Sequence, residues 1–184
     1  MKVIPTEIPE VLLLEPRVFE DARGTFFESY NRRTFARATG VDVEFVQDNV
    51  SRSVRNVIRG LHYQVERPQG KLIRALRGRI FDVAVDLRES ASTFGSWVGF
   101  TLSDADPRLA WIPPGFAHGF LVLSDFADVQ YKVTDYWYAE HERTIVWNDP
   151  NLAIGWPLEG AEAKPVLSAR DAAGVAFHAA DRYP

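Results

Sequence analysis

Hydrophobic residues along this chain fall in short runs, many of them alternating with polar residues and rich in valine, isoleucine and aromatic side chains. Such alternation is typical of β-strands that bury one face. The pattern predicts strands at residues 11–19, 24–30, 43–51, 57–64, 71–76, 79–87, 97–102, 109–112, 119–123, 127–134 and 145–147. The first two are expected to form a hairpin joined by Asp21-Ala22-Arg23.

Residues 31–38 have the pattern of a helix instead, with Asn31 as a suitable N-cap and Gly40 as a suitable stop. The Pro- and Ala-rich tail from Ala153 is expected to wrap around the rest, with one helical turn after Ser168. Many short strands with no linker or internal repeat predict an all-β sandwich or barrel. We expect a single domain over residues 1–184 with a few short peripheral helices.

The composition narrows the class of protein. A length of 184 residues is enough for one domain with a substantial core, and twelve Phe, six Tyr and five Trp favour β-structure. A net charge of −4 argues against a general nucleic-acid binder, and the lack of cysteine excludes disulfides and thiolate chemistry. The N-terminal apolar run, 11–14, is too short for a signal peptide or membrane span, so a cytoplasmic protein without membrane or nucleic-acid partners is expected.

The segment Gly60-Leu61-His62-Tyr63-Gln64, followed by Lys71 and Gly78, has the outline of the first cupin motif, which reads Gly, His-x-His, Glu, Gly. Gln64 stands where the second His is expected, and Lys71, seven residues before Gly78, stands where the Glu is expected. Because an ammonium group has no lone pair to donate, such a site repels a divalent metal, and we expect no metal and no cofactor. A histidine beside a positive charge suits removal of a proton next to a carbonyl group and stabilisation of the resulting enolate.

The second cupin motif is present in outline at residues 113–118, where Pro-Pro-Gly-Phe-Ala-His fits Pro-x-Gly-x-x-His. By itself Pro-Pro-Gly predicts a tight turn. Together the two motifs favour a jelly roll among the β-sandwiches and barrels. They place His62, Lys71 and His118 in one barrel mouth.

Nearly the whole chain resembles the dTDP-4-dehydrorhamnose 3,5-epimerase family. The resemblance rests on the segments DARGTFFESYN, FVQDNVSRS, IRGLHYQ, QGKLIRALRGRIFDVAVDLR, STFGSW, WIPPGFAHGFLVLS, QYKVTDY, EHERTIVWNDP and LSARD. It implies a metal-free, cofactor-independent, cupin-like jelly roll that forms homodimers. It also implies inversion of carbons 3 and 5 of dTDP-4-dehydro-6-deoxy-D-glucose to give dTDP-4-dehydro-L-rhamnose, with rhamnose for a surface polysaccharide as the end product.

The resemblance further implies four catalytic residues. His62 is the base, Asp171 orients it, Tyr131 is the acid on the opposite side of the sugar, and Lys71 stabilises the enolate. Each also has an ordinary structural explanation. A histidine can pack inside a barrel, Ser168-x-x-Asp171 reads as a capping box, a tyrosine is common on a strand, and a lysine is common at a strand edge.

A set of binding residues follows from the same resemblance. Arg23 and Arg59 correspond to arginines that bind the nucleotide-sugar, Arg23 by reaching into the neighbouring subunit's site; arginine forks suit phosphate oxygens. Further binding positions are Phe26, Glu28, Gln47, Asn49, His118, Glu142 and Arg170. Arg170 stands where the family often has Lys, and either cation serves.

Trp137 departs from the family pattern. The family often has a Tyr-Tyr pair after the catalytic tyrosine, and the second tyrosine stacks on thymine; here the pair is Tyr136-Trp137. A tryptophan keeps an aromatic face for stacking but lacks the hydroxyl group. Alternatively, Trp137 is part of an aromatic cluster with Tyr136 and Tyr138.

Three other functions stay open at this point. A mono-epimerase acting at carbon 3 or 5 of another dTDP-deoxysugar would use nearly the same residues. A metal-dependent cupin oxygenase would need more ligands than His62 and His118 supply. A non-catalytic sugar-binding cupin would keep the arginines without needing a His–Asp pair opposite a tyrosine.

Overall fold

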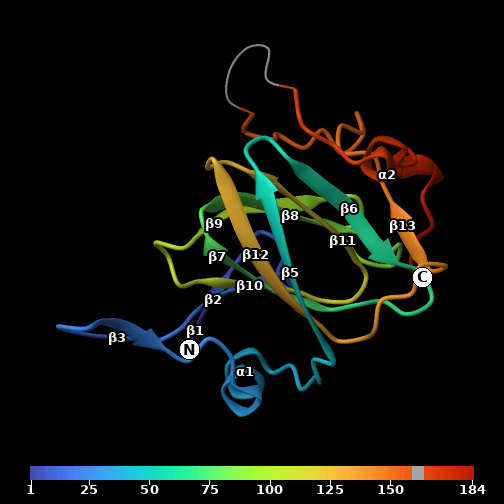
Figure 1. The fold of residues 1–184 in the computed structure, drawn as a ribbon. Helices are drawn as coiled ribbons and strands as arrows, with labels where there is room; N and C mark the ends of the chain where they lie inside the picture. Colours follow the sequence, from blue (N-terminus) through green and yellow to red (C-terminus); the bar gives the residue numbers. More distant parts are fainter. Residues whose placement is uncertain (159–163) are drawn as a thin grey trace.

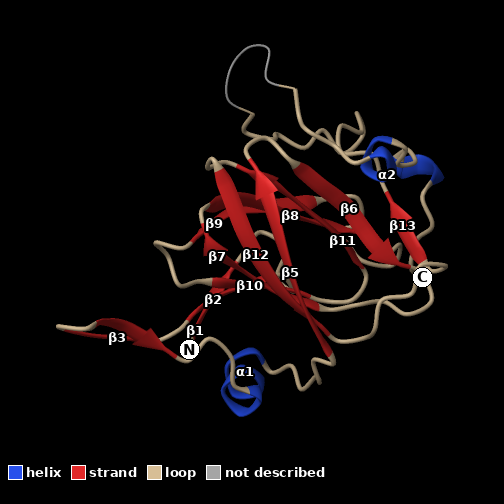
Figure 2. Ribbon diagram, in the orientation of Figure 1, coloured by secondary structure: helices blue, strands red, loops and turns tan. Residues whose placement is uncertain are grey.

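The computed structural model describes residues 1–158 and 164–184, and within these ranges two antiparallel sheets pack through a shared core (Figures 1 and 2). The larger sheet contains, in spatial order, β1 (Lys2–Pro5), β2 (Leu12–Glu15), β10 (Leu109–Ile112), β7 (Lys71–Arg77), β12 (Phe126–Val133) and β5 (Gln47–Val54). The smaller sheet contains β13 (Glu142–Thr144), β6 (Ile58–Gln64), β11 (Phe116–Val122), β8 (Arg79–Asp86) and β9 (Trp97–Ser103). From β5 to β13 most successive strands change sheet, so the chain winds around its core.

The core between the sheets explains this arrangement. Apolar residues from both sheets form one buried cluster, which includes Ile73, Ala84, Ala110, Phe120 and Val129. Alternation along each strand turns these side chains inward, and their removal from water is the main favourable term in folding. The predicted all-β jelly roll is confirmed.

The helical elements are short and peripheral, as expected. They are α1 (Arg32–Thr39), α2 (Ala169–Ala172) and the 3₁₀ helix η1 (Phe177–Ala179). Asn31 caps α1 by accepting a hydrogen bond from the Thr34 N–H, and Gly40 ends it with a left-handed φ of 75°. Among the described residues no helix is long and apolar enough to cross a membrane.

The predicted strand at 11–19 is wrong, because the chain leaves the larger sheet at Pro16. β2 ends at Glu15, and a proline has no N–H to donate to a strand ladder. The chain then forms a separate hairpin from β3 (Val18–Asp21) and β4 (Gly24–Phe27), which projects from the body of the molecule (Figure 1).

Other strand boundaries also differ from prediction. The strand expected at 43–51 begins only at Gln47, the strand expected at 119–123 already begins at Phe116, and β1 was not foreseen. The last strand is 142–144 and not 145–147, because the fully buried Ile145 follows the edge strand and bridges to Val175 in the tail. The hydrophobic pattern therefore predicted a strand at Ile145, which is buried by the tail, and did not predict the more exposed strand β13 just before it.

The tail packs against the smaller sheet, which agrees with the expectation that it wraps around the rest. Isolated parallel bridges join Val166 to Val57 and Val175 to Ile145. The predicted helical turn after Ser168 is α2. Residues 159–163 of the tail lie outside the described residues.

Candidate active site

A cavity of about 540 Å³ opens between the two sheets and is covered at one side by α2. Its lining includes most of the residues predicted from the sequence: His62, Lys71, Tyr131, Asp171, Gln47, Asn49, Arg59, His118, Trp137, Glu142 and Arg170. Gln69, Phe120 and Ser168 also line it and were not predicted. Residues far apart in the sequence therefore meet at one site.

His62 lies on β6 and is paired with Asp171 on α2. The His62 Nε2 and Asp171 Oδ1 atoms are 2.6 Å apart, and Ser168 Oγ donates to Asp171 Oδ2 at 2.6 Å. Burial alone would raise the pKa of the Asp171 carboxyl, but the hydrogen bonds from His62 and Ser168 outweigh this effect and lower the pKa to about 2. An ionised Asp171 accepts the Nε2–H of His62, which leaves the Nδ1 lone pair free to take up a proton.

The structure supports both explanations of the Ser168-x-x-Asp171 pattern, a helix cap and a carboxylate that orients His62. Ser168 caps α2 by accepting the Asp171 backbone N–H at 3.1 Å, and the same hydroxyl donates to the Asp171 carboxylate. The helix cap therefore fixes the carboxylate that faces His62.

Gly60, two residues before His62, is required because the backbones of two strands pack closely there. Gly60 has a φ of 106°, and a Cβ built there would lie 2.5 Å from the backbone oxygen of His118. Its N–H donates to Asp171 Oδ1 at 3.2 Å. A side chain at this position would push β6 away from β11 and move His62 away from Asp171.

Tyr131 reaches the cavity from the other sheet. It lies on β12, with Asn49 on β5 and Ile73 on β7 as its cross-strand partners. Burial raises the pKa of the Tyr131 hydroxyl, with Arg59 opposing this effect and Glu142 adding to it. The phenol is therefore protonated at neutral pH, and it lines the cavity on the sheet opposite His62.

Lys71 is buried beneath the cavity at the start of β7. Its Nζ donates to the backbone oxygen of His62 at 3.2 Å. Burial lowers the pKa of Lys71 to about 8, although the carboxylates of Glu142 and Asp82 favour its charged form. The ammonium has three N–H groups, so donors remain for an oxygen in the cavity.

His118 lies directly opposite His62 on the neighbouring strand β11. Its Nε2 is 2.8 Å from Asp82 Oδ2, and Asp82 is fully buried. Burial lowers the pKa of His118 despite the opposing effect of Asp82. No motif points to Asp82, but an aspartate within the largely apolar strand 79–87 signals a buried pair, because buried carboxylates need a partner.

The outer part of the cavity is polar and aromatic. The Glu142 carboxylate accepts the indole N–H of Trp137 at 2.5 Å and also pairs with Arg170. The Trp137 backbone N–H donates to Gln47 Oε1 at 3.3 Å, and Gln47 in turn donates to Asn49 at 2.8 Å. About half of the Trp137 side chain is exposed, so an aromatic face stands free beside the two cations Arg59 and Arg170.

Three predicted binding residues lie away from this cavity. Arg23 is at the tip of the projecting hairpin, paired with Asp21, and Phe26 on β4 packs against Phe19. The third, Glu28, accepts a hydrogen bond from Asn31 at the start of α1. The fold of a single chain does not bring them together with His62.

The metal-ligand positions of the first motif carry different contacts here. Gln64 is bonded to backbone groups, and Lys71 occupies the carboxylate position. Throughout residues 1–158 and 164–184, no group of three or more His, Asp or Glu side chains is arranged to hold a metal ion.

Known proteins share both the sequence and the fold. A family model described as dTDP-4-dehydrorhamnose 3,5-epimerase matches residues 5–179. The dTDP-4-dehydrorhamnose 3,5-epimerase of Pseudomonas aeruginosa is 59% identical over 184 residues, which make up 100% of this chain and 100% of that protein. A crystal structure of dTDP-6-deoxy-D-glucose-3,5-epimerase from Legionella pneumophila, in complex with dTDP-4-keto-L-rhamnose, has a TM-score of 0.94 at 47% identity and covers 100% of this chain and 98% of that chain. ChmJ, a 3'-monoepimerase from Streptomyces bikiniensis in complex with dTDP-quinovose, has a TM-score of 0.87 at 30% identity, with 97% and 88% covered.

Proposed function

This chain belongs to the dTDP-4-dehydrorhamnose 3,5-epimerase family, and we propose that His62 and Tyr131 perform its proton transfers from opposite sides of the cavity. The enzyme is an isomerase that inverts carbons 3 and 5 of dTDP-4-dehydro-6-deoxy-D-glucose and so produces dTDP-4-dehydro-L-rhamnose. The observation that supports the assignment is the His62–Asp171 pair on one wall with Tyr131 on the other. Inversion needs one group to remove a proton and another to deliver a proton to the opposite face.

In this proposal the Nδ1 atom of His62 removes the proton from carbon 5 or carbon 3. Both protons are acidified by the ketone at carbon 4. Asp171 stabilises the imidazolium that forms, as an oriented carboxylate does for other catalytic histidines. The imidazolium later loses its proton to solvent, which returns His62 to the neutral form for the second inversion.

Lys71 stabilises the enolate oxygen at carbon 4. It is a buried cation next to His62, and a preorganised charge in a site with little water is worth more than the same charge in solution. His118 lies next to the same position and is the second candidate to bind this oxygen. Tyr131 then delivers its proton from the face opposite His62, and the phenolate that remains takes up a proton from solvent before the second inversion.

The outer cavity binds the nucleotide in this proposal. Trp137 stacks on the thymine, while Arg59 and Arg170 contact the pyrophosphate. Gln47, Asn49 and Glu142 complete this wall, the last by orienting both Trp137 and Arg170.

We further propose that the chain forms a homodimer, in which the three predicted residues outside the cavity contact the substrate of the neighbouring subunit. The projecting hairpin carries Arg23 at its tip and an exposed Phe26, and a short hairpin with an exposed aromatic residue favours contact with a second copy of the chain. We assign Arg23, Phe26 and Glu28 to the neighbouring subunit's site. The whole chain acts as one catalytic domain.

Deuterium uptake from heavy water tests the activity. With dTDP-4-dehydro-6-deoxy-D-glucose as substrate, enzyme-dependent label is expected at both carbon 3 and carbon 5, read by mass and proton NMR against a control without enzyme. Label at a single carbon would show that the enzyme is a mono-epimerase and not a double epimerase. ChmJ, which has the same fold, is described as a 3'-monoepimerase. The absence of label would reject the epimerase function.

A further inference from the structure

Gln64 occupies a position that the proton-transfer mechanism does not use. It lies two residues after His62 on β6, so both side chains are on the same face of the strand. The residue is 2% exposed. A buried amide with two donors and an acceptor must satisfy them within the protein, and its partners therefore show what it holds in place.

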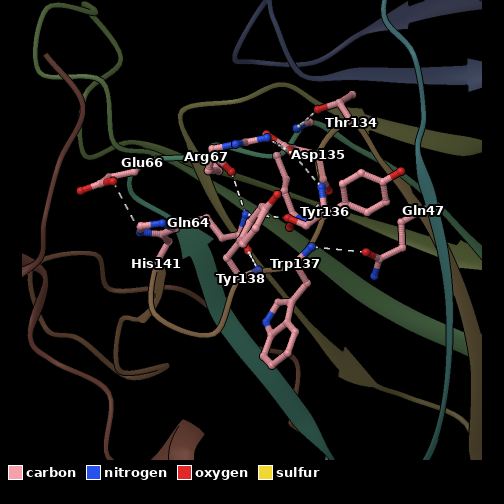
Figure 3. A network of polar contacts seen from close by, with 12 residues as sticks. Gln47, Gln64, Glu66, Arg67, Thr134, Asp135, Tyr136, Trp137, Tyr138 and His141 are labelled. Atoms are coloured by element: carbon pink, nitrogen blue, oxygen red, sulfur yellow. Dashed lines mark hydrogen bonds and ion pairs between the residues drawn. The ribbon is translucent and has the colours of Figure 1, made fainter.

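Its partners belong mainly to one loop. Figure 3 shows the segment Asp135-Tyr136-Trp137-Tyr138, here called the aromatic loop, which follows β12 and is not a helix or strand. Gln64 Nε2 donates to the Tyr136 backbone oxygen at 3.2 Å and to the Arg67 backbone oxygen at 2.7 Å. Gln64 Oε1 accepts the Tyr138 backbone N–H at 2.7 Å. The amide thus bonds to the loop on both sides of Trp137.

The base of the aromatic loop has further support. Arg67 forms a two-pronged ion pair with Asp135, at 2.7 and 3.0 Å, and stacks over the Tyr138 ring at 5.0 Å (Figure 3). Gln69 donates to the Asp135 backbone oxygen at 2.8 Å. These contacts hold one end of the loop, while Gln64 reaches its middle.

Gln64 and Glu142 act on the same residue from neighbouring strands. Glu142 on β13 is the cross-strand partner of Gln64 on β6, and its carboxylate accepts the Trp137 indole N–H. Gln64 fixes the backbone on either side of Trp137, and Glu142 fixes its ring. An exposed tryptophan has many available rotamers, so this double constraint lowers the entropy that it would lose on binding a ligand.

We propose that Gln64 is a positioning residue that clamps the aromatic loop and thereby presents Trp137 to the nucleobase, with no part in proton transfer. This inference rests on the proposed nucleotide-binding role of Trp137. An imidazole has no group that could serve two carbonyl oxygens and an N–H at once, whereas a primary amide has the matching donors and acceptor. The residue that stands in place of the motif's second histidine therefore serves substrate recognition.

The test separates binding from chemistry. Gln64→Met keeps the length of the side chain and removes its hydrogen bonds, and Gln64→Glu keeps the shape and removes the two donors. We expect roughly tenfold weaker binding of dTDP by calorimetry and a similar rise in KM for Gln64→Met, because the two hydrogen bonds to the aromatic loop are lost together with the one to Arg67. We expect kcat to change by less than about twofold, since His62 and Tyr131 are untouched.

Gln130→Glu is the matched control. Gln130 lies next to Tyr131 on β12, and its side chain lines a small separate hollow with Tyr30 and Arg74. The same amide-to-acid change there should leave dTDP affinity and KM at wild-type values. A lower kcat in Gln64→Met with unchanged dTDP affinity would overturn the proposal.

A double variant tests whether Gln64 acts through Trp137. Trp137→Ala should weaken dTDP binding by roughly tenfold, and adding Gln64→Met should then have little further effect, because two residues that act as a unit are not additive. Full additivity would reject the coupling. If Trp137→Ala leaves dTDP affinity unchanged, the nucleobase role fails, while the deuterium assay judges the epimerase activity separately.

If neither Gln64 variant folds, the wild-type protein supplies the readout. The Tyr138 amide, which donates to Gln64, should be protected from hydrogen exchange in the absence of nucleotide. Rapid exchange at Tyr138 would show that the loop is not clamped.

Discussion

Replacing Lys71 with methionine should stabilise the protein while it strongly lowers turnover. Lys71 is buried, and its pKa falls from an ordinary value of 10.5 to about 8. Each pH unit of this difference corresponds to about 1.4 kcal/mol, so keeping the ammonium charged at neutral pH costs the folded state about 3 kcal/mol. Methionine has a similar length and no charge, so the free energy of unfolding at pH 7 should rise by about 2–3 kcal/mol after the lost hydrogen bond to His62 is subtracted.

The free energy of unfolding should also depend on pH through the titration of Lys71. Because the pKa of Lys71 is lower in the folded state, the unfolded chain binds the extra proton between about pH 8 and pH 10.5. The destabilising effect of the buried ammonium is therefore absent above about pH 10.5. It grows as the pH falls and is complete once the pH has fallen through about 8. Urea unfolding from pH 7 to 10.5 should show a rise for the wild type relative to Lys71→Met, and the other groups that titrate there cancel in the difference.

A matched control and the activity complete the test. Lys2→Met removes an exposed lysine, paired with Glu15 at 3.5 Å, and should change stability by less than about 0.5 kcal/mol at every pH. Deuterium exchange should fall by about 10²–10³-fold in Lys71→Met, because the enolate loses its charge partner. A Lys71→Met protein that is less stable than the wild type at pH 7, or that keeps its turnover, would refute the reasoning.

Further predictions concern the proton transfers and the dimer. His62→Ala should abolish exchange at both carbons while dTDP binding stays within about threefold, and retained exchange would remove His62 as the base. Tyr131→Phe should impair inversion more than exchange, since His62 can still return a proton to its own face; normal epimerisation would assign the acid elsewhere. Asp171→Asn should lower kcat by about 10²–10⁴-fold with a small change in KM, because the His62 Nε2–H loses its charged acceptor, and a kcat near that of the wild type would contradict this. Arg23→Ala should have low activity that is partly restored by mixing it with His62→Ala, since each mixed dimer has one intact site; the lack of any restoration would place Arg23 in its own subunit's site.

The sequence predicted what depends on spacing along the chain and missed what depends on packing between elements. His62, Gln64 and Lys71 follow from motif spacing, and the helix after Asn31 follows from its capping residues. The partner of Asp82 could not be assigned, because His118 lies on a neighbouring strand and only the fold brings the two side chains within 2.8 Å. The last strand was misplaced for the same reason: the tail that buries Ile145 comes later in the chain.

With the roles proposed for Gln64 and Lys71, one short segment of the chain serves both halves of the substrate. In a metal cupin, the two positions would supply ligands to one centre and would share one task. Here the amide at Gln64 turns to the aromatic loop, and the ammonium of Lys71 stays at the base of the cavity against the backbone of His62. In the proposed mechanism these two side chains, which lie on strands of opposite sheets, therefore serve nucleotide binding and enolate stabilisation separately. This separation means that a change at Gln64 should appear in KM and a change at Lys71 in kcat, which a shared ligand set would not allow.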